Sequence, residues 1–286
     1  MAGPRQLRGM TDADAETGGD LRDREWRLLR EESWSGAMNM ALDEIAAETA
    51  AAGGPRTVRV YQWEPSTLSL GYRQDPDTVD WAFCEREGIE VTRRQTGGGG
   101  IYHDSHGDVS YSIVAPKAEL PSSLMDCYHL LCTPVLDAFG RMDVAADFAE
   151  EGFPEIYHPA CYLRELHPAH DVVAGGRKIS GNAQYRRKDA VIQHGSLTYS
   201  VDAERHLATF AGHDVSPETF RERVTGIDEE SAATRGDAVA AVEDALVDWT
   251  DASEGSWTDD ELARARERAE EKYAADDWVR RRPDER

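Results

Sequence analysis

The sequence predicts an α+β fold in which antiparallel and mixed strands are flanked by helices. Three strand-like segments follow one another over residues 172–199, separated only by short turns. Apolar residues recur at helical spacing over 38–46 and again over 124–139, so helices are expected on either side of the central strands. Strands and helices do not alternate regularly, and a doubly wound parallel sheet is therefore not expected.

The N-terminal part of the chain begins with a polar segment. Residues 1–24 are rich in Gly, Asp and Arg, with few apolar positions, and they predict a disordered tail. A first strand is expected at 26–29. Ser35 is placed to cap the helix that follows, and Gly53-Gly54-Pro55 is a typical stop signal for it.

Two extended segments come next. Residues 58–63 alternate as a strand does, and Glu64-Pro65-Ser66 turns the chain into the segment 67–74. We expect these two strands to form a hairpin or to lie beside each other. Residues 76–87 predict a short helix, and another strand is expected to begin at Val91.

The second half continues the antiparallel pattern. A strand is expected at 109–114, and residues 172–184 read as two strands joined by a tight Gly-Gly turn. A third strand at 191–199 follows a charged turn. Helical periodicity returns at 236–250 and 259–278, so the chain is expected to end in helices.

Composition limits the function classes. The net charge is −23, with 55 acidic residues and only four lysines, Lys117, Lys178, Lys188 and Lys272. Such a surface repels nucleic acid and is of the acidic, halophilic type. There is neither a long apolar run nor a signal-peptide pattern, so we expect a soluble cytoplasmic protein without a membrane partner.

The four cysteines include no CxxC pair, so neither a zinc site nor any other metal site is expected. Cys84, Cys127 and Cys132 stand among apolar residues and are predicted to be buried thiols. Cys161 differs because it lies in the segment Tyr157-His158-Pro159-Ala160-Cys161-Tyr162, which predicts a loop. The sequence leaves two interpretations of this thiol, an inert loop residue or a nucleophile.

A glycine run is the most unusual feature of the chain, in Arg93-Arg94-Gln95-Thr96-Gly97-Gly98-Gly99-Gly100-Ile101-Tyr102-His103-Asp104. Residues without Cβ atoms let backbone N–H groups approach an anion closely, and the two arginines add fork-shaped charges. An adenylate or acyl phosphate would suit such a loop. A flexible linker is the alternative, but strand-like flanks at 88–92 and 109–114 disfavour it.

Two further positions could carry chemistry. Lys178 lies near a predicted turn and is followed by the small residues Ser180, Gly181 and Ala183, which leave room for a ligand. Its ammonium could neutralise a phosphate or stabilise a developing oxyanion, although a solvated surface charge is the commoner role. His194, in His194-Gly195-Ser196, could equally be a hydrogen-bonded structural residue.

Taken together, these strings resemble the lipoate-protein ligase and octanoyltransferase family, whose catalytic domain is similar to that of biotin-protein ligase. The matching segments are 32–44, 63–74, 93–104, 176–184 and 194–196, in the expected order over roughly residues 26–228. The resemblance implies three parts: a tail over 1–24, a catalytic domain over 25–230 and a helical C-terminal extension over 231–286.

The resemblance implies a lipoate-protein ligase, in which ATP with Mg²⁺ activates lipoate or octanoate as an acyl-adenylate. A lysine of an apo lipoyl domain, on a 2-oxoacid dehydrogenase E2 or a glycine cleavage H protein, would then take the acyl group. Lys178 would be the catalytic residue. The implied substrate- and nucleotide-binding residues are Arg93, Arg94, Thr96, Gly97, Gly98, Gly99, Gly100, Tyr102, His103, Asp104, Asp171, Ser180, Gly181, Asn182, Ala183, His194, Gly195 and Ser196. The segment Arg223-Val224-Thr225-Gly226 resembles a loop that folds over the nucleotide.

Two departures leave the reaction open. Only about 55 residues follow Asp228, fewer than an accessory domain needs, so a small accessory subunit is possible. Cys161 lies 17 residues before Lys178, a spacing that resembles cysteine-dependent octanoyltransferases acting on octanoyl-acyl carrier protein without ATP. The pair His170-Asp171 instead resembles the Asn-Asp of ligases. A biotin ligase and a non-catalytic acyl-binding relative are weaker alternatives.

Overall fold

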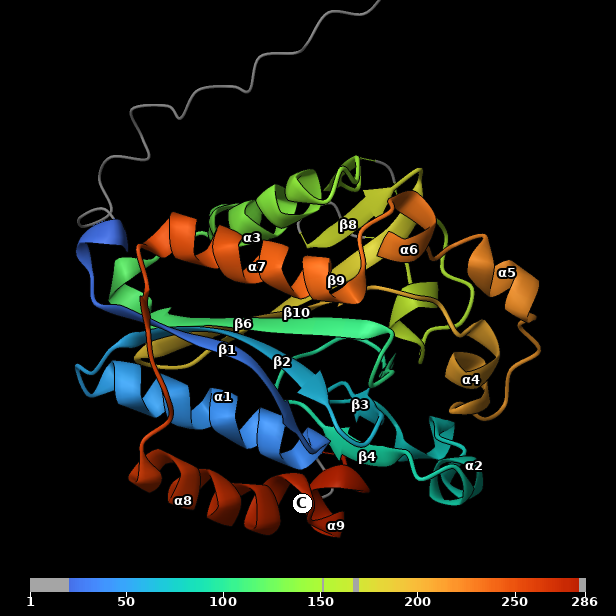
Figure 1. Ribbon diagram of the computed structural model, residues 1–286. Coiled ribbons are helices and arrows are strands. Elements are labelled where there is room, and N and C mark those ends of the chain that lie inside the picture. The colour runs from blue at the N-terminus through green and yellow to red at the C-terminus, as the bar shows by residue number, and fades with distance from the viewer. Residues whose placement is uncertain (1–20, 151, 167–169, 283–286) are drawn as a thin grey trace, which may run out of the picture.

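A mixed sheet forms the centre of the structure (Figure 1). The computed structural model describes residues 21–150, 152–166 and 170–282. Within them the large sheet has eight strands, β1 (Trp26–Trp34), β2 (Arg56–Trp63), β6 (Asp108–Pro116), β7 (Ala146–Phe148), β8 (Asp171–Ala174), β9 (Arg177–Arg186), β10 (Ala190–Thr198) and β11 (Ser253–Glu254). Their order is β11-β1-β2-β6-β10-β9-β8-β7, parallel between β11, β1 and β2 and antiparallel elsewhere.

A smaller sheet stands beside the first. It has the order β4-β3-β5 and consists of β3 (Thr67–Leu70), β4 (Glu90–Arg93) and β5 (Ile101–His103). β3 is parallel to β4 and antiparallel to β5. The predicted hairpin or adjacent pair of 58–63 and 67–74 is therefore wrong, because the turn after β2 sends β3 into the second sheet.

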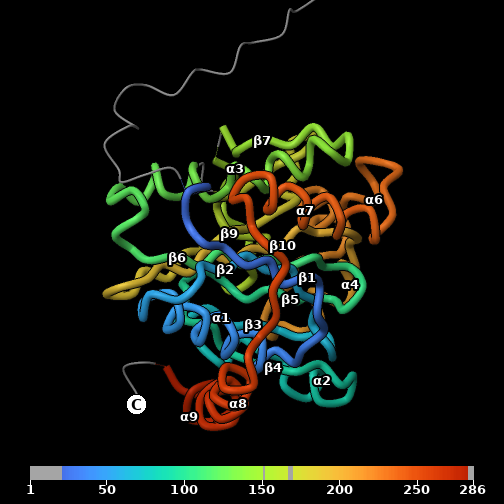
Figure 2. The backbone as a smooth tube through the Cα atoms, turned by 60° about the vertical axis from the view of Figure 1, so that its left-hand side comes forward, coloured from blue at the N-terminus to red at the C-terminus, as the bar shows by residue number. Residues whose placement is uncertain are grey.

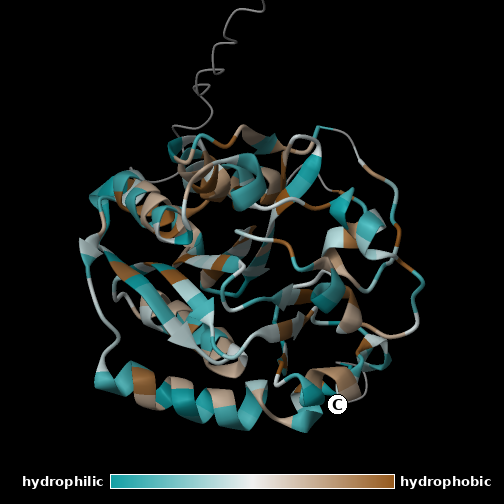
Figure 3. Cartoon of the chain, turned by 45° about the vertical axis from the view of Figure 1, so that its right-hand side comes forward, coloured by the Kyte–Doolittle hydropathy of each residue, from teal (hydrophilic) through white to brown (hydrophobic). Residues whose placement is uncertain are grey.

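Helices cover both faces of the large sheet (Figure 1). On one face lie α3 (Leu124–Arg141) and α7 (Arg235–Thr250), and on the other α1 (Gly36–Ala51), with α8 (Asp259–Arg268) outside it. Figure 3 shows α8 as a largely hydrophilic helix, in line with its position as an outer layer. This arrangement confirms the predicted α+β class with flanking helices.

Alternation along the strands separates the cores. On β1, Leu28 packs in the core under α3 and α7, whereas its neighbour Leu29 packs in the core around α1. Consecutive strand residues point to opposite faces, so one strand contributes to both cores. A third apolar cluster lies under the small sheet and includes Leu68, Cys84 and Phe210.

The helix α1 is the best example of a correctly predicted element. The Ser35 side chain accepts a hydrogen bond from the Met38 N–H at 3.2 Å, as expected of an N-cap. The Glu90 carboxylate accepts from the first two helical N–H groups, those of Gly36 and Ala37, at 2.9 Å each. A negative charge at a helix N-terminus is stabilised by the helix dipole.

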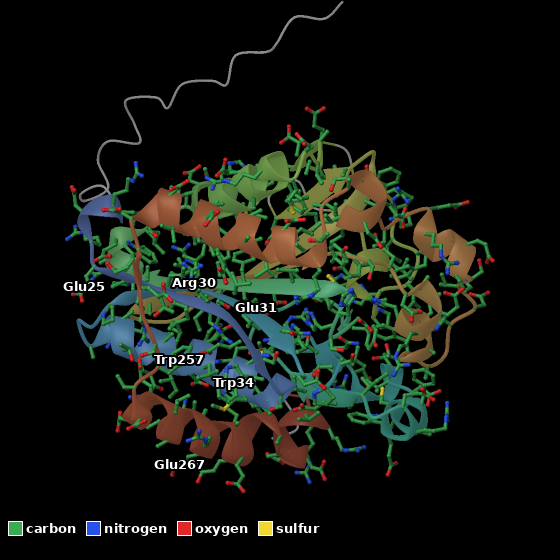
Figure 4. All side chains as sticks on the ribbon, viewed as in Figure 1. Glu25, Arg30, Glu31, Trp34, Trp257 and Glu267 are labelled. Carbon is green, nitrogen blue, oxygen red and sulfur yellow. The ribbon has the colours of Figure 1, made fainter. Side chains whose placement is uncertain are left out.

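The C-terminal segment returns across the molecule to α1. After β11, Trp257 lies on the connection to α8, beside β1 (Figure 4), and its ring N–H donates to Glu32 at 2.9 Å. The Arg27–Glu261 ion pair, with a 2.6 Å contact, fixes α8 to the large sheet. A π-helical turn (Ala269–Tyr273) and α9 (Asp276–Val279) then continue from α8 along the base of the molecule, where Figure 2 shows α8 and α9 beside each other.

Short helices complete the fold. They are α2 (Trp81–Arg86), α4 (Ala203–Ala208), α5 (Pro217–Arg221), α6 (Ile227–Glu230) and the 3-10 turns η2 (Leu21–Asp23), η3 (Pro76–Thr78), η4 (Lys117–Glu119) and η5 (Cys161–Leu163). The predicted helix over 76–87 is thus two shorter elements, η3 and α2. Residues 1–20 of the predicted tail over 1–24 lie outside the described residues. The expectation of disorder is wrong at residues 21–23, which form η2. No helix in the described part of the chain is both long and apolar enough to cross a bilayer.

Candidate active site

A cavity of about 590 Å³ lies between the two sheets. Its walls come from β2, β6, β9 and β10 of the large sheet, from β3 and β5 of the small sheet, and from the segments around Gly97 and Cys161. Segments far apart in sequence therefore meet at one site.

A thiol, an ammonium and a carboxylate stand together in this cavity. The Lys178 Nζ lies 2.6 Å from an Asp171 carboxylate oxygen and donates to the Cys161 Sγ at 3.6 Å. It also stands 5.3 Å above the Tyr162 ring. Lys178 is only 2% exposed, so this ammonium is held in the protein with the sulfur on one side and the carboxylate on the other.

Electrostatics fix the charge states of the lysine and the aspartate. Burial lowers the pKa of Lys178, but the charge of Asp171 and the neighbouring Cys161 outweigh it and raise the pKa above its usual range. Burial also disfavours the Asp171 carboxylate, yet Lys178 holds its pKa well below the usual range. The pair is therefore an ammonium and a carboxylate at neutral pH.

Local backbone structure places Lys178. The β8–β9 turn uses Gly175 and Gly176 at φ of +55° and +80°, where L side chains are strained. The Lys178 N–H donates to the Arg223 carbonyl at 2.8 Å, and the Lys178 carbonyl accepts from the Thr225 N–H at 3.0 Å. The segment 223–226, which resembles a nucleotide-covering loop, thus pairs with the backbone of Lys178.

The glycine run supports the Cys161 segment directly. The Gly100 N–H donates to the Pro159 carbonyl at 2.6 Å, and the Gly100 carbonyl accepts from the Cys161 N–H at 2.8 Å. A Cβ on Gly99 would come within 2.7 Å of the Pro159 oxygen and 2.8 Å of the Cys161 nitrogen. Gly97 and Gly98 line the cavity, whereas Gly99 and Gly100 bring the cysteine backbone close.

The Arg94 side chain lies at the cavity but is committed to the glycine run. Its guanidinium donates to the carbonyls of Ser69, Gly97 and Gly99 at 2.8, 2.9 and 2.6 Å and to the Thr96 hydroxyl at 3.1 Å. Arg94 therefore holds the shape of the loop, a use that sequence reasoning did not distinguish from anion binding.

The structure does not bring Arg93 into the cavity. Consecutive residues in extended backbone point to opposite sides, and Arg93 turns away from Arg94. Its guanidinium donates to the Gly71 carbonyl at 2.9 Å and, near the C-terminus, to the carbonyls of Trp278 and Val279 at 3.0 and 2.9 Å. Arg93 joins α9 to the small sheet and cannot reach a phosphate in the cavity.

The two predicted histidines line the cavity wall. The bonds at their ring nitrogens are His103 Nδ1 to Asp108, His103 Nε2 to Ser69 at 2.9 Å, His194 Nδ1 to Asp43 at 3.3 Å and His194 Nε2 to Thr96 at 2.8 Å. Burial, partly offset by Asp108, lowers the pKa of His103. The His103 ring also stacks on Trp63, with ring centroids 4.0 Å apart.

The other predicted site residues divide into three groups. Gly181, Asn182, Ala183, Gly195 and Ser196 line the cavity. Tyr102 and Asp104 lie away from it, bonded to each other at 3.0 Å, while Ser180 and Thr96 are buried in the wall behind it. A Cβ on Gly181 would lie 3.3 Å from the Lys178 Nζ, so that glycine leaves the ammonium its space.

Sequence reasoning missed a set of residues that line the cavity, namely Met40, Tyr61, Trp63, Ser69, Ile101, Ser110, Tyr128, Gly152, Glu155, Arg164, Glu165, Leu166 and Gln184. Six of them, Tyr61, Trp63, Ser69, Ile101, Ser110 and Gln184, stand on strands, whose alternation identifies an inner face without saying what covers it. The others lie on α1, on α3 and in loops, where the sequence pattern does not indicate a cavity. His170 also lines the cavity. The sequence singled it out only as part of the pair His170-Asp171, without a role in the site.

The sequence matches the lipoyl protein ligase A/B catalytic domain over residues 35–249. It is similar to an octanoyltransferase LipM of Brevibacillus brevis, with 30% identity covering 90% of this chain and 99% of that protein. A LipM of Kyrpidia tusciae is 33% identical, covering 88% and 97%.

Solved structures of ligases share the fold. A lipoate-protein ligase A bound with ATP superposes with a TM-score of 0.75 at 25% identity, covering 90% of this chain and 98% of that one. A bi-partite lipoate protein ligase of Thermoplasma acidophilum, studied with its E2 lipoyl domain, gives 0.74 at 23%, covering 90% and 96%. The chain belongs to the lipoyl protein ligase A/B catalytic-domain family and is an enzyme of the lipoate ligase and octanoyltransferase group.

Proposed function

We propose that the protein is a cysteine-dependent octanoyltransferase that moves an octanoyl group from a carrier thioester to a lysine of a lipoyl domain. The observation that carries this proposal is the 3.6 Å contact between the Cys161 Sγ and the Lys178 Nζ inside the cavity. The octanoyltransferase names of the relatives support it.

In the first half-reaction the Cys161 sulfur attacks the thioester carbonyl of octanoyl-acyl carrier protein. A new thioester forms on Cys161, and the bond to the carrier sulfur breaks, so the carrier leaves as a thiol with the proton that the Cys161 thiol has lost. The Lys178 ammonium lies beside the reacting sulfur and stabilises negative charge on the sulfur and on the tetrahedral oxyanion. Its Asp171 contact holds it in place.

In the second half-reaction the amine of an acceptor lysine attacks the Cys161 thioester. An amide forms, the carbon–sulfur bond breaks, and Cys161 is regenerated. The acceptor that we infer is an apo lipoyl domain, such as that of a 2-oxoacid dehydrogenase E2 or a glycine cleavage H protein, on the strength of membership in the lipoyl protein ligase family.

The ATP-dependent ligase is the second candidate, favoured by the likeness to a ligase bound with ATP. The lysine and arginine side chains that line the cavity within the described residues are Arg94, Arg164 and Lys178. Arg94 is bonded to carbonyl groups and Lys178 to Asp171, so a triphosphate with Mg²⁺ finds few uncommitted donors. These residues fit ATP poorly, and no step is assigned to it. The predicted accessory subunit belongs with this alternative.

The test is acyl transfer to an apo lipoyl domain in two parallel reactions. One contains octanoyl-acyl carrier protein without ATP, and the other lipoate or octanoate with Mg-ATP; each is repeated with Cys161→Ala. We expect product from the carrier alone, and none with the variant. Product that requires ATP and survives Cys161→Ala would instead establish the ligase.

A further inference from the structure

The acyl donor of the proposed reaction is a protein, so the enzyme needs a surface that receives it. This inference rests on the proposed function. The donor's thioester has to reach Cys161, and the docking surface must therefore adjoin the cavity. The segment 152–163, which leads to Cys161, meets this requirement because some of its residues line the cavity and others are exposed.

Two apolar side chains of this segment are exposed. Phe153 is 41% exposed and Ile156 is 40% exposed, whereas most large apolar side chains in the described part of the chain are buried. Their sequence neighbours Gly152 and Glu155 line the cavity, so both side chains lie at the surface next to the cavity wall. Exposed apolar groups beside a site are typical of places where another molecule binds.

The guanidinium of Arg223 lies against the same segment. Its Cζ lies 5.1 Å from the Phe153 ring centroid, and its Nη2 donates to the Pro154 carbonyl at 3.0 Å. The Arg223 carbonyl accepts from the Lys178 N–H at 2.8 Å, and the Lys178 Nζ lies 3.6 Å from the Cys161 sulfur. Arg223 is therefore joined through its backbone to the reacting lysine and through its side chain to the exposed segment.

The charge of Arg223 has no counter-charge among the described residues. Its side-chain hydrogen bond goes to a carbonyl, and burial lowers the pKa of Arg223 without a carboxylate that offsets the effect. Arg221, two residues earlier, differs because its hydrogen bond to the Glu204 carboxylate raises the pKa of Arg221. A guanidinium that no carboxylate of the described chain neutralises can pair with a carboxylate of another molecule.

Charge complementarity favours an acidic partner at this place. With a net charge of −23, most of the enzyme surface repels an acidic protein, so an unpaired cation determines where such a protein can approach. The acceptor brings a lysine ammonium to the same cavity, and Arg223 repels that charge. The donor brings an uncharged thioester, so this repulsion does not oppose it.

We propose that Phe153, Ile156 and Arg223 form the docking surface for the acyl donor, a carrier protein with carboxylates around the root of its thioester arm. The Arg223 guanidinium pairs with one of those carboxylates, and the two apolar side chains pack against apolar residues between them. The arm enters the cavity beside the segment 152–163, which leads its thioester toward Cys161.

Acylation of Cys161 by two donors tests this proposal. One donor is octanoyl-acyl carrier protein, and the other is octanoyl-phosphopantetheine, which has the same arm but no protein. For Arg223→Gln and for Phe153→Ala/Ile156→Ala we expect the second-order rate constant of acylation to fall about tenfold with the carrier. With the small donor it should stay within about twofold of wild type. Arg223→Lys keeps the charge and should retain most of the activity with the carrier.

The matched control is Arg221→Gln, which removes a neighbouring guanidinium that is already paired with Glu204 and does not line the cavity. We expect unchanged rate constants with both donors. The second half-reaction is measured separately, by adding an apo lipoyl domain to enzyme that the small donor has acylated. Each variant should then transfer its acyl group at the wild-type rate.

Three outcomes would overturn the proposal. Wild-type acylation of both docking variants by the carrier would show that the donor docks elsewhere. An equal loss with both donors would place the effect at the reacting groups. Normal acylation followed by slow transfer to the lipoyl domain would assign the surface to the acceptor. Wild-type enzyme that acquires no acyl group on Cys161 from either donor would instead contradict the octanoyltransferase itself.

Discussion

Two groups of residues in the cavity wall handle buried charge differently. In the first group, the glycine-run end, Arg94 is tied to backbone carbonyls and His194 is bonded through both ring nitrogens. In the second group, the reacting end of Cys161, Lys178 and Asp171, the Lys178 ammonium divides its contacts between the Asp171 carboxylate and a thiol, which is a weak acceptor. Satisfied polar groups rigidify a site, whereas a charge that faces a weak partner can act on a substrate. The comparison separates the residues that build the cavity from those that react in it.

The largest effect is expected at the reacting end. Lys178→Met removes the ammonium beside the Cys161 sulfur, and we expect acyl transfer to fall by about 10²–10³-fold. It also leaves the Asp171 carboxylate buried without a counter-charge, at a cost of about 3–5 kcal/mol in the free energy of unfolding. Urea unfolding and transfer rates measure the two effects.

The double variant Lys178→Met/Asp171→Asn separates these effects. It replaces the buried ion pair by neutral groups, so the free energy of unfolding should recover most of the loss while transfer stays slow. Full activity in the double variant would contradict a reacting role for this end of the cavity.

An intermediate effect is expected at the glycine-run end. Arg94→Lys keeps the positive charge but replaces a planar fork by a single ammonium, which cannot satisfy the Ser69, Gly97 and Gly99 carbonyls together. We expect the free energy of unfolding to fall by about 2–3 kcal/mol from unpaired buried groups. Transfer by the folded fraction should stay within about tenfold of wild type. A much larger loss of transfer with unchanged stability would place Arg94 among the reacting residues.

The smallest effect is expected for the pH dependence of stability, through His206 in the wall behind Tyr162. His206 is packed against Tyr102, Tyr162 and Phe220, and burial lowers its pKa to about 3. Below about pH 6.5 the His206 imidazole of the unfolded chain therefore binds a proton that the folded chain does not bind. The free energy of unfolding falls as pH falls from 6.5 toward 3, by about 2 kcal/mol at pH 5.

His206→Leu removes that proton, so the unfolding midpoint should decline less steeply between pH 6.5 and 4, with no change in transfer at pH 7. An identical acid limb in wild type and variant would show that other groups set the acid sensitivity. The His206 side chain is buried away from the main cavity. This variant therefore tests whether a residue outside the reacting end affects stability without affecting acyl transfer.

Local signals predicted the long elements of the fold. The structure contains the Ser35 cap, the helix predicted over 124–139 and the three strands from residue 171 onward. Capping, periodicity and turn formation depend on residues that are close in sequence, so a single sequence can reveal them. Partner choice is not local, which is why β2 and β3 were expected side by side and yet lie in different sheets. The two-residue strand β11 carries too little pattern to be found.

The sequence identified many of the site residues but not the role of each one. Lys178, the glycine run and Cys161 were identified, but the 17-residue spacing between Cys161 and Lys178 gives no distance between their side chains. Arg93 and Arg94 look alike in sequence, and only the alternation of the strand and the return of the C-terminus separate their roles. The glycines were expected to bind a ligand, whereas Gly99 and Gly100 also admit the cysteine backbone.

The most direct test of the account is the mass of the enzyme after reaction with octanoyl-acyl carrier protein in the absence of ATP. Quenched in acid and digested, the wild-type protein should carry one octanoyl group on the peptide that contains Cys161, and hydroxylamine should remove it, as expected for a thioester. Cys161→Ala should remain unmodified. An unmodified wild-type Cys161, together with an acyl-adenylate that forms when Mg-ATP and octanoate are supplied, would contradict the central claim.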